Sequence, residues 1–148
     1  MPNIYTAEWY AAILELANTR QDVTAKAPRG EWRLAVEVVG DGLSPYVPEG
    51  ETRHWFIRLE NGRMVEFREA DGPIPGKGLS YRITGPAHVF EGIAGGVVDP
   101  VEVGLNGVLT VRGDMRLLMQ YADLTSVIFE VYTQNNVTQW PGARPPYK

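Results

Sequence analysis

The stretch "RHWFIRLENGRMVEFRE" (residues 53–69) carries the strongest structural signal in the chain. Two runs suited to β-strands flank Asn61-Gly62, a dipeptide that readily adopts the positive φ angles of a type I′ turn. The pattern predicts an antiparallel hairpin, and an unbroken register places Trp55 opposite Arg68. That register mixes charged and apolar side chains on both faces, so we expect both faces of the hairpin to be partly covered.

Strands and a helix are predicted on either side of this hairpin. Residues 31–39 ("EWRLAVEVV") alternate apolar and polar side chains, as a half-buried strand does. Residues 79–84 and 108–112 also fit strands. Near the N-terminus, "AEWYAAILELAN" (7–18) has apolar residues at helical spacing, and Thr6 is a suitable N-cap. With the hairpin, these segments predict a sheet of five strands and a preceding helix.

The later helices are predicted from the residues that start them. Short helices begin at Pro86 and Pro100, because proline is favoured in the first turn of a helix. A longer helix is predicted after Gly113-Asp114, where a strand ends. One stripe of that helix would carry Met115, Leu118, Met119 and Ala122.

The element order predicts an α+β fold, with a five-stranded mainly antiparallel sheet and helices packed on one face. Tight hairpins, rather than repeated βα units, favour antiparallel pairing. We expect one domain over residues 1–140 and an extended, poorly ordered C-terminal tail over 141–148. Residues 19–27 fit a second short helix. Residues 124–137 keep helical spacing but are rich in β-branched side chains, so helix and strand both remain open.

Composition excludes several functional classes. The 148 residues suffice for one domain with a substantial core. A net charge of -4 without a Lys/Arg cluster argues against nucleic acid as a partner. The absence of cysteine removes disulfides, thiolate nucleophiles and cysteine-based zinc sites. No run of about 18 apolar residues and no signal-peptide pattern is found. We therefore expect a cytoplasmic protein with no stable membrane insertion.

No motif for catalysis, metal or cofactor binding is found. His54 and His88 show neither metal-ligand spacing nor a partner that would orient a base. The segment "GPIPGKG" (72–78) fails the phosphate-loop pattern, since the spacing is one residue short and prolines remove amide donors. No serine lies in a nucleophile elbow. The sequence thus predicts a protein that is not an enzyme and has no cofactor or metal.

Two questions remain open at the level of sequence. Glu66 is predicted to form an ion pair with Arg68 or a neighbouring arginine, and the alternative is that Arg68 or Arg82 holds the polar head of a ligand. The other question is whether the apolar interior is filled or hollow, because methionine suits exchangeable contents as well as an ordinary core. The side chains concerned are Trp9, Trp32, Trp55, Phe90, Met115 and Met119.

Three stretches resemble the sterol carrier protein type-two family, the sterol-binding or lipid-transfer domain. "HWFIRLENG" (54–62) is similar to the family's Trp-led strand and Asn-Gly turn. "FEGIAGGVVDPVEVGLNGVLTVRGDMRLLMQYADL" (90–124) is similar to its run of short helices, strand and closing apolar helix. Residues 31–39 fit its first strand more loosely. Family spacing is kept at Gly96, Asp99-Pro100, Gly107, Gly113 and Met115.

The resemblance implies an apolar tunnel enclosed by the sheet and helices. It would bind a hydrophobic small molecule such as a fatty acid, an acyl-CoA or a sterol-like lipid, without chemistry of its own. The expected contacts are Trp55, Phe90, Ile93, Met115, Leu118, Met119 and Ala122, with Arg68 and Arg82 near the head group. The alternative is an accessory or oligomerisation module that serves a partner enzyme, or forms a homodimer, through its C-terminal segment.

Overall fold

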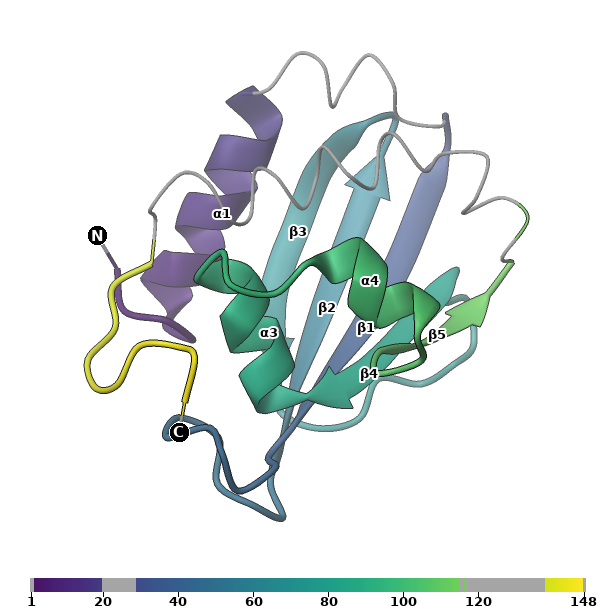
Figure 1. Cartoon of the computed structure of the whole chain (residues 1–148). Helices are drawn as coiled ribbons and strands as arrows, with labels where there is room; N and C mark the ends of the chain where they lie inside the picture. The colour runs from purple at the N-terminus through teal and green to yellow at the C-terminus, as the bar shows by residue number, and fades with distance from the viewer. Residues whose placement is uncertain (1, 20–28, 115, 117–137, 148) are drawn as a thin grey trace.

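The computed structural model describes residues 2–19, 29–114, 116 and 138–147. Among these residues, one helix precedes four strands, and two short helices precede the last strand (Figure 1). In chain order they are α1 (Ala7–Thr19), β1 (Glu31–Val39), β2 (Thr52–Glu60), β3 (Arg63–Ala70), β4 (Tyr81–Pro86), α3 (Ala87–Ala94), α4 (Pro100–Leu105) and β5 (Thr110–Gly113). The predicted segments at 19–27 and 124–137, and the predicted helix after Asp114, lie almost wholly outside the described residues.

The five strands form one mixed sheet in the order β3-β2-β1-β4-β5. Three of its pairings are antiparallel, and only β1 and β4 run parallel. Strand β4 lies on the opposite side of β1 from the β2-β3 hairpin, and it starts at the same end of the sheet as β1. Helices α1, α3 and α4 lie on one face of the sheet, which we call the inner face (Figure 1). The predicted α+β class and mainly antiparallel sheet are confirmed.

The β2-β3 hairpin contains a bulge that the sequence did not predict. Asn61 and Gly62 have φ angles of 49° and 87°, as expected for the predicted turn. The register shifts between Arg58 and Leu59, and Val65 is the extra residue. Trp55 therefore pairs with Glu69, not with Arg68, so the predicted register is wrong beyond the bulge.

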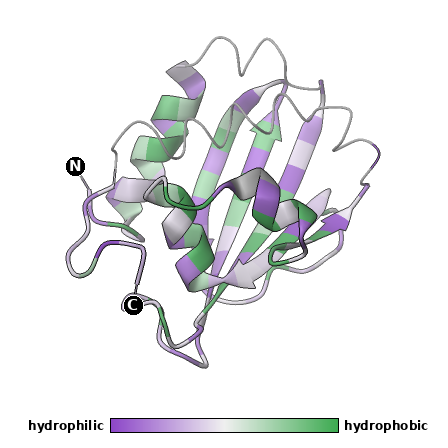
Figure 2. Cartoon of the chain, in the orientation of Figure 1, coloured by the Kyte–Doolittle hydropathy of each residue, from purple (hydrophilic) through white to green (hydrophobic). Residues whose placement is uncertain are grey.

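The bulge sorts the hairpin side chains into an apolar face and a charged face. Figure 2 shows hydrophobic and hydrophilic residues alternating along the strands. The inner face carries Trp55, Ile57, Leu59, Met64 and Phe67. The opposite, outer face carries Phe56, Arg58, Glu66 and Arg68. A one-residue shift exchanges the two faces of a strand. The bulge thus explains why an unbroken register mixes polar and apolar residues.

Helix α1 binds the hairpin along its edge. The Thr6 hydroxyl accepts a hydrogen bond from the Trp9 amide at 3.3 Å, which confirms the predicted N-cap. At the other end, the Asn18 side-chain amide donates to the Met64 carbonyl at 2.7 Å and accepts from the Met64 amide at 2.9 Å. These bonds satisfy backbone groups of the edge strand β3, which would otherwise be open for pairing.

Strand β4 is approached closely by a buried side chain at a glycine. A Cβ built on Gly85, just before the helix, would lie 2.3 Å from Cδ2 of Leu109, which is buried. A side chain at position 85 would therefore clash with Leu109, so glycine is required by the lack of space and not by the backbone conformation.

We expect Gly85→Ala to lower the free energy of unfolding by about 1–3 kcal/mol, because the added methyl group overpacks the site. Urea unfolding measures the loss. Gly72→Ala is the matched control, since its Cβ would meet no atom within 4 Å. An equal loss in both variants would contradict the steric explanation.

The C-terminal residues pack against the domain. Gln139 pairs with Asn3 in a parallel bridge, Thr138 and Pro145 are buried, and Tyr147 is half-buried. The described residues 138–147 therefore make specific contacts with the domain, and the expected boundary between domain and tail stays a prediction. These residues lie beside the N-terminal end of α1 and beside α3 (Figure 1).

Candidate functional site

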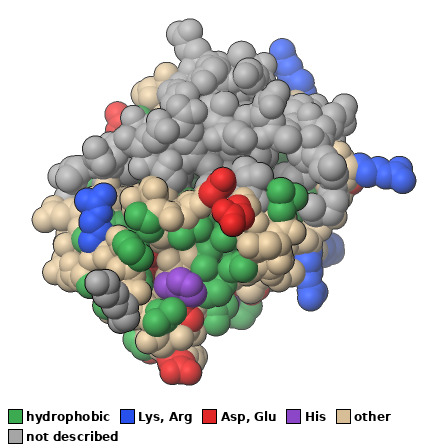
Figure 3. Space-filling view, viewed as in Figure 1, with side chains coloured by type: hydrophobic (Ala, Val, Ile, Leu, Met, Phe, Trp, Pro, Cys, Tyr) green, Lys and Arg blue, Asp and Glu red, His purple; other side chains and the backbone are tan. Residues whose placement is uncertain are grey.

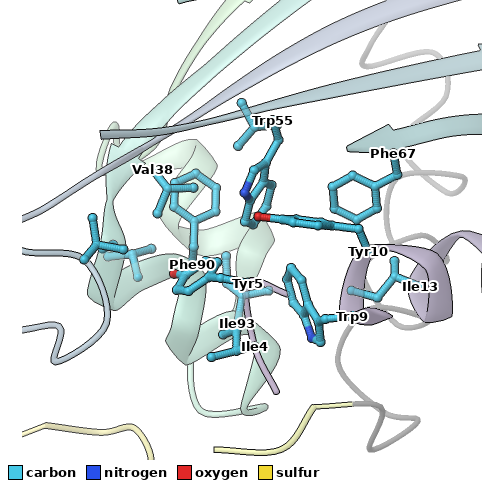
Figure 4. Packing of buried hydrophobic residues seen from close by; sticks show 14 of the residues in the cluster. Ile4, Tyr5, Trp9, Tyr10, Ile13, Val38, Trp55, Phe67, Phe90 and Ile93 are labelled. Atoms are coloured by element: carbon cyan, nitrogen blue, oxygen red, sulfur yellow. The ribbon is translucent and has the colours of Figure 1, made fainter. Parts of the chain in front are cut away.

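Half of the inner face is a filled aromatic core. Neighbouring ring centroids lie 5.1 to 6.2 Å apart, mostly edge to face, which is a favourable geometry for aromatic pairs (Figure 4). The rings are those of Tyr5, Trp9, Tyr10, Trp55, Phe67 and Phe90. All of them are buried, so this half of the interior is occupied by the protein's own side chains.

The other half of the inner face carries a row of half-buried apolar side chains on β2, β1, β4 and β5. We call this row the apolar strip; its members are Trp32, Leu34, Ile57, Leu59, Ile83 and Val111. The register places them together, because Leu34 pairs with Ile57 and Ile83 pairs with Val111. Ile57, Leu59 and Ile83 pack against the buried core. The strip thus continues the core as an incompletely covered apolar surface.

Three of the predicted ligand contacts belong to the buried core rather than to the strip. Trp55, Phe90 and Ile93 are 3%, 7% and 1% exposed, and the rings of Trp55 and Phe90 are 5.8 Å apart. The structure brings these three side chains together, at the border of the strip. Met115, Leu118, Met119 and Ala122 lie outside the described residues, so their role stays a prediction.

The two predicted head-group arginines lie on the outer face. Arg68 lies over the Phe56 ring, 5.0 Å from its centroid, and pairs with Glu66. Hydrogen bonding from Arg68, together with the charges of Arg68 and Arg58, outweighs desolvation and lowers the pKa of Glu66. The predicted ion pair of Glu66 is confirmed. Arg82 lies 3.2 Å from the Glu37 carboxylate, so both arginines have acidic partners.

His88 has a partner that the sequence did not reveal. The Asp41 carboxylate contacts Nδ1 of His88 and accepts the His88 backbone amide at 2.9 Å. Asp41 thereby caps α3, whose own N-cap residue, Pro86, forms no side-chain cap. The statement that no residue orients His88 is wrong. The two residues are 47 positions apart, so no local pattern could have shown the pair.

Asp41 is held in its ionised form. Burial would raise the pKa of Asp41, but hydrogen bonds from the backbone of His88 and Ser44 outweigh it and lower the pKa to about 2. The ordinary value is 3.8, so the carboxylate adds stability above about pH 4. This stability is lost as the pH falls toward 2.

We expect Asp41→Asn to lower the free energy of unfolding by about 2 kcal/mol at about pH 6. The difference from the wild type should shrink to about 1 kcal/mol at about pH 2.5, because the Asp41 carboxylate of the wild type is then partly protonated. Denaturant unfolding at the two pH values measures both differences. A pH-independent difference would contradict the assignment to ionised Asp41.

Glu91 is the second polar residue that the sequence analysis missed. Its side chain is fully buried, and its carboxylate accepts hydrogen bonds from Tyr5 at 2.6 Å, Ser44 at 2.7 Å and Tyr147 at 2.6 Å. No arginine or lysine among the described residues pairs with it. The available signal was one acidic residue in the otherwise small or apolar helix run "FEGIA". Buried carboxylates require such donors.

The Glu91 cluster connects four segments far apart in the chain. Tyr5 precedes α1, Ser44 lies in the β1-β2 loop, Glu91 is on α3, and Tyr147 is near the C-terminus. Burial and the hydrogen bond to Glu91 raise the pKa of Tyr147, so its hydroxyl stays a proton donor. The arrangement fastens the segments together. It does not form a nucleophile-base pair.

Within residues 2–19, 29–114, 116 and 138–147, no group of three His, Cys, Asp or Glu side chains could hold a metal ion. His54 is on the outer face, with Nδ1 3.9 Å from the Glu37 carboxylate. No described helix combines the length and apolar content needed to cross a bilayer.

The fold and the apolar inner face define an α+β domain of the kind found in sterol carrier proteins. A family model described as the SCP-2 sterol transfer family matches residues 14–126, well over half of the chain. The chain belongs to the SCP-2 sterol transfer family. A search of curated proteins gives no match.

Solved structures share this fold at low sequence identity. A crystal structure of sterol carrier protein 2 is 16% identical with a TM-score of 0.74, covering 89% of this chain and 98% of that one. A solution structure of the Thermus thermophilus protein TT1886, "possibly sterol carrier protein", is 17% identical with a TM-score of 0.72, covering 95% and 93%. A "UbiJ-SCP2 Ubiquinone synthesis protein" is 16% identical with a TM-score of 0.52, covering 86% and 95%. At these identities the likeness shows the fold alone.

Proposed function

We propose that the protein is a non-catalytic carrier that binds a hydrophobic small molecule, such as a fatty acid, an acyl-CoA or a sterol-like lipid, against the apolar strip. The observation that carries the proposal is the strip itself: the inner face is filled by aromatic rings beside α1 but only half-buried toward β4 and β5. Family membership supports the same ligand class.

The strip offers enough apolar surface for useful affinity. Burial of one methylene contributes about 0.8 kcal/mol, so about ten methylenes contribute about 8 kcal/mol before ordering costs. Micromolar binding corresponds to about 8 kcal/mol. A longer chain offsets those costs, so this affinity needs no polar anchor.

We place Trp55, Phe90 and Ile93 behind the ligand and keep Met115, Leu118, Met119 and Ala122 as proposed contacts. Arg68 and Arg82 are left out because they lie on the outer face.

Native mass spectrometry of the purified protein tests this function without a choice of ligand. We expect a population heavier than the bare chain by the mass of one lipid. Extraction with organic solvent should remove the added mass, and added fatty acid should restore it. Bare chain in every preparation, together with no uptake of added lipid, would count against a carrier.

A second candidate function is an accessory module that binds a partner enzyme or a second copy of itself. The observation in its favour is a set of exposed apolar side chains around α3 and α4, on a face where hydrophobic side chains gather (Figure 3). Leu105 is 85% exposed, and Val97 and Val108 are 50% and 41% exposed. Sedimentation at several concentrations distinguishes a self-associating module from a carrier, since a carrier needs no association.

A cytoplasmic location is part of the carrier proposal and is tested by cell fractionation.

A further inference from the structure

The apolar strip ends in two stacked aromatic rings, at the end of the sheet where β1 and β4 begin and β5 ends. The ring centroids of Trp32 and Tyr81 lie 6.5 Å apart, with an angle of 18° between the ring planes. Both side chains are on the inner face, because Leu34 lies two residues after Trp32 in β1 and pairs with Tyr81 of β4. Tyr81 is buried and Trp32 is half-buried, so this aromatic pair is only partly covered.

Main-chain groups from two segments hold the aromatic pair. The Trp32 indole N–H donates to the Arg29 carbonyl at 3.3 Å, and the Tyr81 hydroxyl donates to the Asp114 carbonyl at 2.7 Å. The Asp114 carboxylate accepts the Arg116 amide at 3.1 Å. The backbones of Arg29 and Arg116 thus flank the aromatic pair.

The two flanking arginines are exposed and have free charges. Within the described part of the chain, neither the Arg29 nor the Arg116 guanidinium group forms an ion pair. In Figure 3, Lys and Arg side chains project from the side of the molecule where Figure 1 shows the start of β1 and the end of β5. These guanidinium groups are therefore available to bind an anion.

The carboxylates at this end of the sheet do not cancel those charges. Glu31 and Glu60 are already paired with Arg33 and Arg58. Asp114 is the third described carboxylate here; burial and then the charge of Asp114 raise the pKa of the Tyr81 hydroxyl, which therefore stays protonated. Two free arginines beside one carboxylate leave this end positive, although the whole chain has a net charge of -4.

We propose that this end of the strip is a head-group subsite, in which Arg29 and Arg116 bind the anionic head of a ligand whose hydrophobic tail lies on the apolar strip. This inference rests on the carrier function proposed above. It narrows the ligand class to ionised amphiphiles, with a carboxylate or phosphate head, over neutral sterols. A guanidinium group presents a planar fork of donors that matches either anion.

Arg112 separates the effect of position from the effect of charge alone. It is exposed on β5, close in sequence to Arg116, but it pairs in register with Arg82 and so lies on the outer face. A head group whose tail lies on the inner face does not reach this side of the sheet. Arg112 thus contributes to the general positive field but not to the head-group subsite.

The double variant Arg29→Gln/Arg116→Gln tests the subsite in the full-length chain, with Arg112→Gln as the matched control. Glutamine keeps the Arg29 carbonyl and the Arg116 amide, so the main-chain bonds around the aromatic pair remain. The probes are cis-parinaric acid, which is ionised at about pH 7.5, and its neutral methyl ester, which has the same tail. The coenzyme A thioester of the same acid supplies phosphate groups in place of the carboxylate. Fluorescence titration of delipidated protein gives the Kd of each probe.

We expect the wild type to bind the acid about tenfold more tightly than the methyl ester, the factor that one charge-assisted hydrogen bond gives. The double variant should bind acid and ester about equally, and Arg112→Gln should keep the wild-type preference within about twofold. If the double variant loses more affinity for the thioester than for the acid, the head is a phosphate; if it loses more for the acid, the head is a carboxylate.

Two results would contradict the subsite alone: equal binding of acid and ester by the wild type, or an unchanged preference in the double variant. A wild-type protein without saturable binding of any probe would overturn the carrier function and the subsite with it.

Discussion

Trp9→Ala is expected to lower the free energy of unfolding by about 3–5 kcal/mol, one of the largest effects of any single substitution in this chain. Trp9 is fully buried, and its ring meets those of Tyr5, Tyr10 and Trp55. The substitution opens a cavity among these buried rings. Urea unfolding followed by circular dichroism measures the loss.

The matched control for this substitution is Trp9→Phe. Phenylalanine keeps a ring in the core but removes the indole N–H that donates to Thr138. We expect it to lose about half as much stability as Trp9→Ala, because most of the apolar volume remains. A loss below about 1 kcal/mol for Trp9→Ala would contradict a filled aromatic core beside α1.

Glu91→Ala is expected to lower the free energy of unfolding by about 3 kcal/mol, because it removes the carboxylate that accepts from three hydroxyl groups, two of them on buried residues. The hydroxyls belong to Tyr5, Ser44 and Tyr147. The loss should be accompanied by faster proteolysis at the C-terminus, since one of the three, Tyr147, holds the C-terminal residues to α3. Thermal unfolding and limited carboxypeptidase digestion measure the two effects.

Glu91→Gln separates the acceptor role from the volume of the side chain. The amide oxygen can accept from one or two hydroxyls, but the amide N–H₂ is a donor that faces donors. We therefore expect an intermediate loss of about 1–2 kcal/mol. If both variants were as stable as the wild type, Glu91 would not be the acceptor at the centre of a buried cluster.

Local turn and cap chemistry made most of the fold predictable. Asn61-Gly62 selects the hairpin, Thr6 starts α1, and Pro86 precedes α3, each through the conformation or hydrogen bonds of a few adjacent residues. Such signals act within about four positions of the chain. The order of elements that they define, together with the family resemblance, was enough to predict the sheet and the side on which its helices lie.

The buried polar contacts could not be predicted from local sequence patterns, because the partners are far apart in sequence. Glu91 is 86 positions from Tyr5 and 47 from Ser44, and Asp41 is 47 from His88. The bulge at Val65 was not predicted for a related reason. A bulge is selected by the burial of the whole hairpin face, which the turn residues do not encode.

The sequence left a filled and a hollow interior equally open, and the described structure shows that the half of the inner face beside α1 is filled. Trp9, Trp55 and Phe90 fill the half beside α1. Leu34 and Ile83 on the other half are only half-buried. Aromatic composition could not distinguish these halves, because Trp32 and Trp55 have the same side chain and differ only in what covers them.

The most direct test of the carrier proposal is a titration of delipidated protein with cis-parinaric acid, comparing two neighbouring residues of β2. Ile57→Asn alters the apolar strip, whereas Phe56→Asn alters the outer face. Circular dichroism confirms that both variants fold. We expect saturable micromolar binding by the wild type, at least about tenfold weaker binding by Ile57→Asn, and a change within about twofold for Phe56→Asn. Equal affinity in all three proteins, or no saturation of the wild type, would contradict ligand binding on the inner face.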